Sequence, residues 1–173
     1  VAYGSEKKSR KQDEKELENT AWHESGHALL GLILDNNAKI DKITIIPRTK
    51  SLGHVSFLSE EKHSTKSQLL NSICIALGGR VGEEMLAGDY TPGASSDIRS
   101  ATRTARNMVT KWGMSSLGML HLNNMDEGWK THELSDDMLQ NIDKEMRGIV
   151  DGQYDRANKL LDMNKESLKN LSE

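Results

Sequence analysis

The sequence has little of the material that several protein classes require. Its 173 residues include one cysteine, two prolines and only 4 % aromatic residues. A single cysteine excludes an internal disulfide and fits a reducing compartment. Cys74 lies in an apolar run, where we expect a buried and unreactive thiol. With so few aromatic side chains, the core must consist mainly of Leu, Ile, Val, Met and Ala, which favours packed helices over a β-sandwich.

Long apolar runs and a strong net charge are also missing. The best apolar run, Ala28 to Leu34, is too short to cross a bilayer. A net charge of −3 offers no basic surface for nucleic acid, and the sequence contains no Walker A pattern. The chain begins with Val1 rather than Met and shows no signal peptide. We therefore expect a piece of a longer protein, whose membrane and nucleotide-binding parts would lie outside it.

The most informative stretch is the His-Glu-x-x-His pattern formed by His23, Glu24 and His27. On an α-helix, residues four apart project from one face, so the two imidazoles can bind one zinc ion. Glu24 then points beside the ion, where its carboxylate can take a proton from a zinc-bound water instead of binding the metal. The pattern predicts a zinc peptidase, provided that a helix and a third ligand accompany it.

Hydrophobic periodicity predicts a mainly α domain with a small antiparallel β-sheet over residues 13–173. Residues 1–12 are polar and basic, and we interpret them as a linker. Ser95 or Ser96 should cap the third helix, with Ile98 facing inward. Gly78, Gly79 and Gly82 inside the second helix indicate close approach to a neighbouring backbone. The expected helices cover about 13–34, 65–87, 95–112, 135–161 and 165–171, and the expected strands cover 39–47 and 54–58.

A catalytic zinc site needs a third protein ligand. Three carboxylates follow the histidine pair at suitable places: Glu83 and Glu84 near the end of the second helix, and Asp97 at the start of the third. Each also has an ordinary interpretation, as surface charge or as a favourable charge at a helix N-terminus. Spacing alone does not choose among them.

Several segments, taken together, resemble the peptidase domain of the FtsH family of membrane-anchored, ATP-dependent zinc proteases. The resemblance covers nearly the whole chain. It rests on five motifs in the family's order: His23-Glu24-Ser25-Gly26-His27-Ala28-Leu29, Lys42-Ile43-Thr44-Ile45-Ile46-Pro47-Arg48, Leu77-Gly78-Gly79-Arg80-Val81-Gly82-Glu83-Glu84, Thr91-Pro92-Gly93-Ala94-Ser95-Ser96-Asp97-Ile98 and Met108-Val109-Thr110-Lys111-Trp112-Gly113-Met114. Ser25, Pro92 and Ser96 replace the family's usual Ala, Thr and Asn, which affects loop shape and substrate preference rather than the metal ligands.

The resemblance implies a zinc-dependent endopeptidase with one Zn²⁺ per chain, held by His23, His27 and Asp97, and with Glu24 as the catalytic base. Glu83 and Glu84 would then support the site without binding the metal. In the family, an ATPase module and transmembrane segments, both outside this chain, deliver unfolded and membrane proteins to a homo- or hetero-hexamer. The peptidase domain would lie on the cytoplasmic, matrix or stromal side of a bacterial, mitochondrial or plastid membrane.

Two other hypotheses remain on the residues alone. The chain could be a helical assembly module with a structural or vacant metal site, or a free-standing zinc peptidase of another type. The presence of both Glu24 and Asp97 argues against the first, and the linker-like start from Val1 to Arg10 argues against the second. The residue that stabilises the oxyanion is not evident, although His54, on an expected strand that could hold an extended substrate, is a candidate.

Overall fold

The computed structural model of the chain describes residues 14–34, 39–44, 54–58, 65–122 and 134–173. The prediction of a mainly helical domain is confirmed. None of the helices in these ranges is long and apolar enough to span a membrane. The elements follow in the order α1 (Glu14–Leu34), β1 (Lys39–Thr44), β2 (His54–Leu58), α2 (Lys66–Ala87), the short 3₁₀ helix η1 (Pro92–Ala94), α3 (Ser95–Thr110), α4 (Asp136–Met163) and α5 (Lys165–Ser172).

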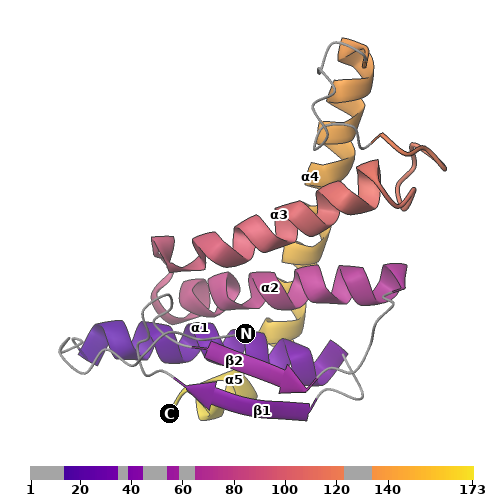
Figure 1. Ribbon diagram of the computed structural model, residues 1–173. Coiled ribbons are helices and arrows are strands. Elements are labelled where there is room, and N and C mark those ends of the chain that lie inside the picture. Colours follow the sequence, from indigo (N-terminus) through magenta and orange to yellow (C-terminus); the bar gives the residue numbers. More distant parts are fainter. Residues whose placement is uncertain (1–13, 35–38, 45–53, 59–64, 123–133) are drawn as a thin grey trace, which may run out of the picture.

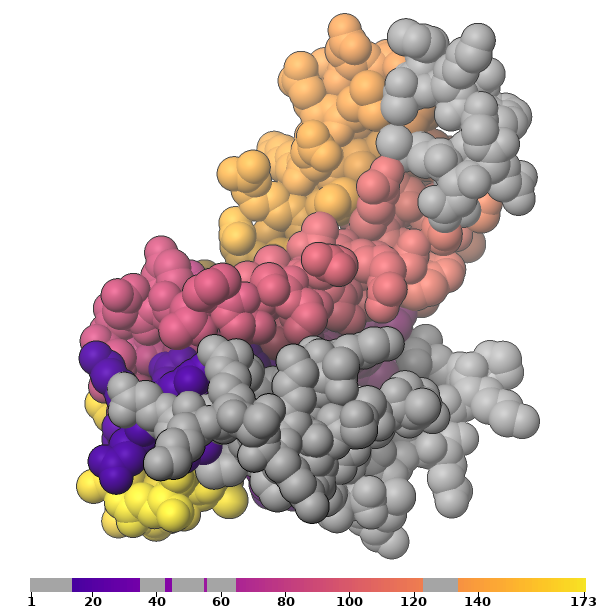
Figure 2. Space-filling view, turned by 60° about the vertical axis from the view of Figure 1, so that its left-hand side comes forward, coloured from indigo at the N-terminus to yellow at the C-terminus, as the bar shows by residue number. Residues whose placement is uncertain are grey.

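Helix α2 is the centre of the domain and packs against α1, α3 and α4. Figure 1 shows α1, α2 and α3 as stacked layers, with α5 beneath α1 and α4 running behind the stack and out beyond it. The projecting part of α4 also stands clear of the body in Figure 2. Two apolar clusters hold the layers together. One joins α1, α2, α4 and α5 through residues such as Leu30 and Leu161, and the other joins α2 and α3 through Leu77 and Met108.

The ends of α2 and α4 follow from local sequence signals. Thr65 caps α2 in a reciprocal capping box with Gln68, and Gly88 ends the helix in the left-handed conformation at φ 64°. Ser135 caps α4 by accepting a hydrogen bond from the backbone N–H of Met138. These helix boundaries, and the buried position of Cys74, confirm the predictions made from the sequence.

Helix α3 begins at Ser95 as expected, but its cap differs from the prediction. Neither Ser95 nor Ser96 caps this helix, because the chain already turns helically through η1. Thr91 caps η1 instead by accepting from the backbone N–H of Gly93 at 3.1 Å. The inward position expected for Ile98 is also wrong, since this side chain is 40 % exposed. The buried face of α3 follows Asp97 instead, at Ala101, Ala105 and Met108.

The backbones of α1 and α2 touch through glycine, as the sequence indicates. A Cβ at Gly26 would overlap the carbonyl of Gly78, and a Cβ at Gly82 would overlap the carbonyl of Trp22. These contacts bring the face of α1 that carries the two histidines directly against α2. Glycine at these positions is therefore required by the closeness of two backbones rather than by a turn.

The two strands lie beside α1. β1 pairs antiparallel with β2, with Thr44 opposite His54 and an irregularity in register between Ile40 and Lys42. In Figure 1 the pair crosses in front of α1, on the side away from α4.

The interpretation of residues 1–12 as a linker concerns a segment that lies outside the described residues.

Candidate metal centre

His23 and His27 occupy adjacent turns of α1 and share one face of the helix. Their Nε2 atoms lie 3.1 Å apart, and their side chains are only 13 % and 12 % exposed. Each ring is fixed from behind by its other nitrogen. His23 Nδ1 is 2.7 Å from Glu83 Oε1, and His27 Nδ1 is 2.7 Å from the backbone carbonyl of Ile75.

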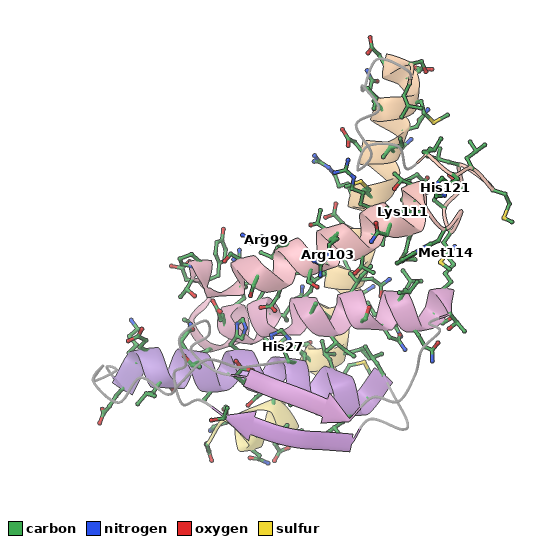
Figure 3. The ribbon with its side chains drawn as sticks, in the orientation of Figure 1. His27, Arg99, Arg103, Lys111, Met114 and His121 are labelled. Atoms are coloured by element: carbon green, nitrogen blue, oxygen red, sulfur yellow. The ribbon has the colours of Figure 1, made fainter. Side chains whose placement is uncertain are left out.

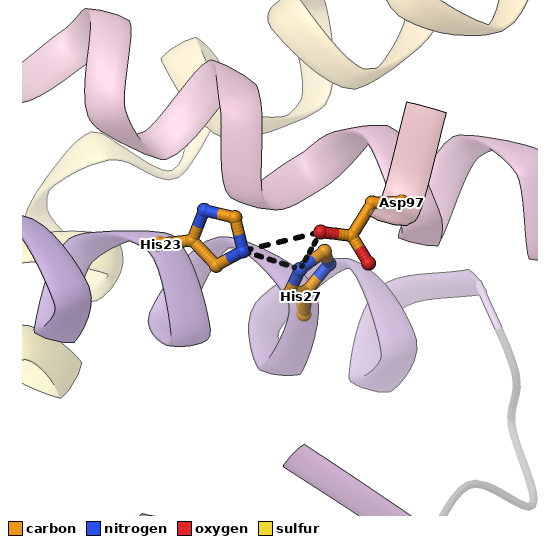
Figure 4. Close-up of side chains that lie close together, drawn as sticks. All are labelled: His23, His27 and Asp97. Atoms are coloured by element: carbon orange, nitrogen blue, oxygen red, sulfur yellow. Dashed lines mark hydrogen bonds and ion pairs between the residues drawn. The ribbon is translucent and has the colours of Figure 1, made fainter. Parts of the chain in front are cut away.

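Asp97, in the first turn of α3, completes the group. Its Oδ2 atom lies 3.3 Å from His23 Nε2 and 3.7 Å from His27 Nε2. Figure 4 shows the carboxylate reaching down from α3 to the pair of imidazoles on α1. Among the described residues, these three form the cluster of potential ligands whose donor atoms all lie within 4.8 Å of one another.

The hydrogen bonds leave three lone pairs facing one another. A carboxylate and a carbonyl can only accept, so both Nδ1 atoms carry the proton and donate to Glu83 and Ile75. Both Nε2 atoms of the neutral rings are then acceptors, and Asp97 adds a carboxylate oxygen. Three acceptors at contact distance repel one another unless a cation or a proton lies between them.

The spacing of these three atoms suits zinc. Zinc–nitrogen and zinc–oxygen bonds of about 2.0–2.2 Å in a tetrahedral arrangement place neighbouring ligand atoms roughly 3.3–3.6 Å apart. The separations of 3.1, 3.3 and 3.7 Å bracket that value. Two imidazoles and one carboxylate are also a ligand set that zinc uses, with a fourth position left for water.

Space for the imidazoles depends on Gly79 of α2. A Cβ at this position would lie 2.5 Å from both His23 Cε1 and His27 Nε2. Any side chain at residue 79 would therefore push the rings out of their positions. The glycines in the second helix thus serve the metal centre as well as the packing of α1 against α2.

The two adjacent glutamates of α2 have different surroundings. Glu83 is 1 % exposed; besides binding His23, it accepts from the backbone N–H and the hydroxyl of Thr91 at 2.8 and 3.0 Å. Glu84 accepts from Arg80 Nε at 2.8 Å and from the hydroxyl of Tyr154 on α4. Glu83 thus touches a candidate ligand, whereas Glu84 ties α2 to α4.

Glu24 is buried beside the histidine pair, with a relative exposure of 6 %. Burial raises the pKa of its carboxyl group, and the opposing attraction of the imidazoles of His27 and His23 does not cancel this effect. The side chain is therefore a carboxyl group in a poorly solvated position close to His23, His27 and Asp97.

The charges of the site favour a cation among its donors. Burial raises the pKa of the Asp97 carboxyl, but hydrogen bonds with His23 and His27 outweigh this and hold it well below the usual range. Burial lowers the pKa of His23, but Asp97 and Glu83 outweigh it and raise the value to about 9. Without a metal, the carboxylates thus draw a proton to the place where the lone pairs converge.

Several contributors were not evident from the sequence. The carbonyl of Ile75 can belong to any residue type, so no sequence signal identifies it, and the bond between Glu83 and Thr91 spans a loop. His54 begins β2, opposite Thr44. The ring nitrogen Nδ1 of another histidine, His121, lies 3.2 Å from the Lys111 carbonyl oxygen, and Figure 3 shows this residue at the far end of α3 from His27. His132 lies outside the described residues.

Comparison with known proteins agrees with this geometry. Residues 10–173 match the model of Peptidase family M41. Relatives named "ATP-dependent zinc metalloprotease FtsH" are 37 % identical in Chlamydia trachomatis serovar L2, 41 % in Rubrobacter xylanophilus and 40 % in Myxococcus xanthus. These alignments cover 99–100 % of this chain but only 20, 28 and 29 % of the respective relatives. The chain, which spans less than a third of these relatives' length, belongs to Peptidase family M41.

Proposed function

We propose that this chain is the zinc-dependent endopeptidase domain of a membrane-anchored, ATP-dependent protease that degrades unfolded and membrane proteins. The observation that carries the proposal is the convergence of His23 Nε2, His27 Nε2 and Asp97 Oδ2. The Nδ1 atom of each histidine is hydrogen-bonded to an acceptor on α2, which leaves Nε2 for the metal. Family membership supports it, since the relatives are named as ATP-dependent zinc metalloproteases. One Zn²⁺ per chain would be held by His23, His27 and Asp97.

The chemistry divides between the metal and the protein. Bound zinc would polarise the scissile carbonyl and bring the pKa of the attacking water to about 7. Glu24 acts as the general base: its carboxylate takes the proton of the attacking water and then delivers it to the leaving amine. The position of Glu24 supports this role, because it is buried next to His23 and is not part of the three-ligand cluster.

Glu83 holds the His23 ring in the orientation that turns Nε2 toward the metal. Its hydrogen bond to Nδ1 fixes the tautomer, and its negative charge increases the basicity of the ring. The carbonyl of Ile75 fixes the tautomer of His27 in the same way. These two contacts fix the orientation and the tautomer of both imidazoles in the metal-free chain.

The remaining parts of the proposal concern the longer protein. Residues 1–12 would link this domain, residues 13–173, to an ATPase module, and ATP would act only through that module. The domain would assemble in a homo- or hetero-hexamer and face the cytoplasm, matrix or stroma, with polypeptides as substrates. The strand pair, with His54 at the start of β2, would offer its edge to an extended substrate.

The test is to compare the chain with its Glu24→Gln variant in two measurements, zinc content and hydrolysis of casein. Glutamine keeps the shape of the side chain but cannot take the proton, so hydrolysis should fall at least about a hundredfold. Zinc content should stay at one ion per chain. Normal hydrolysis by Glu24→Gln would refute the mechanism, and a wild-type chain without zinc would refute the metal centre.

A further inference from the structure

The segment between α2 and α3 determines where Asp97 lies. It leaves α2 at Gly88, passes through Tyr90 and Thr91, and enters η1, which runs directly into α3. Asp97 is the third residue of α3, so a shift of this segment shifts the carboxylate relative to the imidazoles on α1. The two histidines are carried by α1, outside this segment.

Two neighbouring residues of the segment are held by α2. Thr91 binds Glu83 through its backbone N–H and its hydroxyl. Tyr90 is held by Arg80, whose guanidinium carbon lies 3.1 Å from the centre of the tyrosine ring. Tyr90 is 56 % exposed, and one face of its ring is covered by the arginine.

Arg80 is itself fixed in place from the other side. Its Nε donates to Glu84 Oε1 at 2.8 Å, and Glu84 Oε2 accepts from the hydroxyl of Tyr154 on α4. The Arg80 side chain is 19 % exposed and that of Glu84 is 25 % exposed. A planar guanidinium held in this way presents one fixed face to Tyr90.

We propose that Arg80 and Tyr90 are positioning residues, which hold the segment before α3 so that Asp97 meets the histidine pair. The inference rests on the zinc site proposed above. Neither residue is one of the three candidate ligands. Their effect is exerted through the backbone from Tyr90 to Asp97, and it adds to that of the Glu83–Thr91 contact.

The experiment measures zinc affinity of the chain by competition with a chromogenic chelator, together with the visible spectrum of the Co²⁺-substituted chain. The test variants are Arg80→Gln and Tyr90→Leu. Tyr90→Phe keeps the aromatic face and is the conservative variant. Arg103→Gln, which removes an exposed arginine from α3, is the matched control (Figure 3). Far-UV circular dichroism confirms that each variant is folded at the temperature used.

We expect Arg80→Gln and Tyr90→Leu to weaken zinc binding about tenfold, which is the smallest loss usual when a residue that orients a metal ligand is changed. Both variants should also change the Co²⁺ spectrum. Tyr90→Phe and Arg103→Gln should bind zinc as the wild type does, and the double variant should be no weaker than the worse single variant.

Affinities within twofold of the wild type for folded Tyr90→Leu would overturn the inference, even if its melting temperature falls, because a purely structural role predicts that pattern. A wild-type chain that binds no zinc would instead overturn the proposed function, and this inference with it. Tyr90 is exposed, so Tyr90→Leu keeps the test decisive if Arg80→Gln does not fold.

Discussion

The two sides of the metal centre are built in different ways. On one side, His23 and His27 come from a single helix, and both rings are fixed by partners on α2. On the other side, Asp97 follows a turn and a 3₁₀ helix, and its side chain is 28 % exposed, about twice as much as either histidine. The histidine side is therefore set by helix geometry, and the aspartate side depends on how a connecting segment folds.

This difference predicts how the site fails when single residues change. A change that removes a ligand should abolish binding from either side. A change to a residue that holds a ligand in place should weaken zinc binding strongly on the histidine side, where the contacts to the ligands are direct. On the aspartate side the same kind of change should weaken zinc binding less.

Asp97→Asn should have the largest effect. It keeps the shape of the side chain and removes its charge, and we expect zinc affinity to fall at least about a hundredfold. Glu84→Gln is the comparison variant, and we expect it to lose less affinity, because Glu84 binds Arg80 and Tyr154 rather than a histidine. Affinity can be measured by chelator competition. Greater loss in Glu84→Gln than in Asp97→Asn would assign the third ligand to the glutamate.

Gly79→Ala tests the histidine side by steric means. The added methyl group would lie 2.5 Å from His27 Nε2, so we expect zinc affinity to fall by about a hundredfold and stability by about 1–3 kcal/mol. Gly148→Ala on α4 is the control, since nothing lies within 4 Å of that position. Alanine there should stabilise the helix by up to about 1 kcal/mol, as read from thermal unfolding. Unchanged zinc binding in Gly79→Ala would show that the rings do not need this space.

Glu83→Gln should weaken zinc binding about 10–100-fold, because the amide can still accept from His23 but no longer carries the charge. Thr91→Val removes the hydroxyl bond to the same carboxylate and the cap on η1, and it keeps the backbone bond. We expect it to weaken binding severalfold at most. If both variants behaved alike in calorimetric zinc titrations, Glu83 would act through the loop rather than through His23.

Thr65→Ala should affect stability alone. It removes the capping box at the start of α2, at the opposite end of the helix from Glu83, and should cost about 1 kcal/mol of unfolding free energy. Urea denaturation of the metal-free chain measures this loss. A simultaneous change in zinc affinity would mean that the site responds to general loosening of α2.

The same difference explains what could be predicted from the sequence. His23, Glu24 and His27 are close in the chain, so helix periodicity alone brings them together. Asp97 is equivalent to Glu83 and Glu84 on chemistry, and only resemblance to a known family favoured it before the structure placed it. The cap of α3 was predicted wrongly because Thr91 caps the preceding turn, which local serine signals do not reveal. The anchoring of His27 by a backbone carbonyl has no sequence signal at all.

The most direct test of this account is a crystal structure of the zinc-loaded chain with anomalous data collected at the zinc edge. We predict one ion bound to His23 Nε2, His27 Nε2 and an oxygen of Asp97, each at about 2.0–2.2 Å, with Glu83 still on His23 Nδ1. An ion held by Glu83 or Glu84 in place of Asp97, or one located away from the histidine pair, would contradict the account.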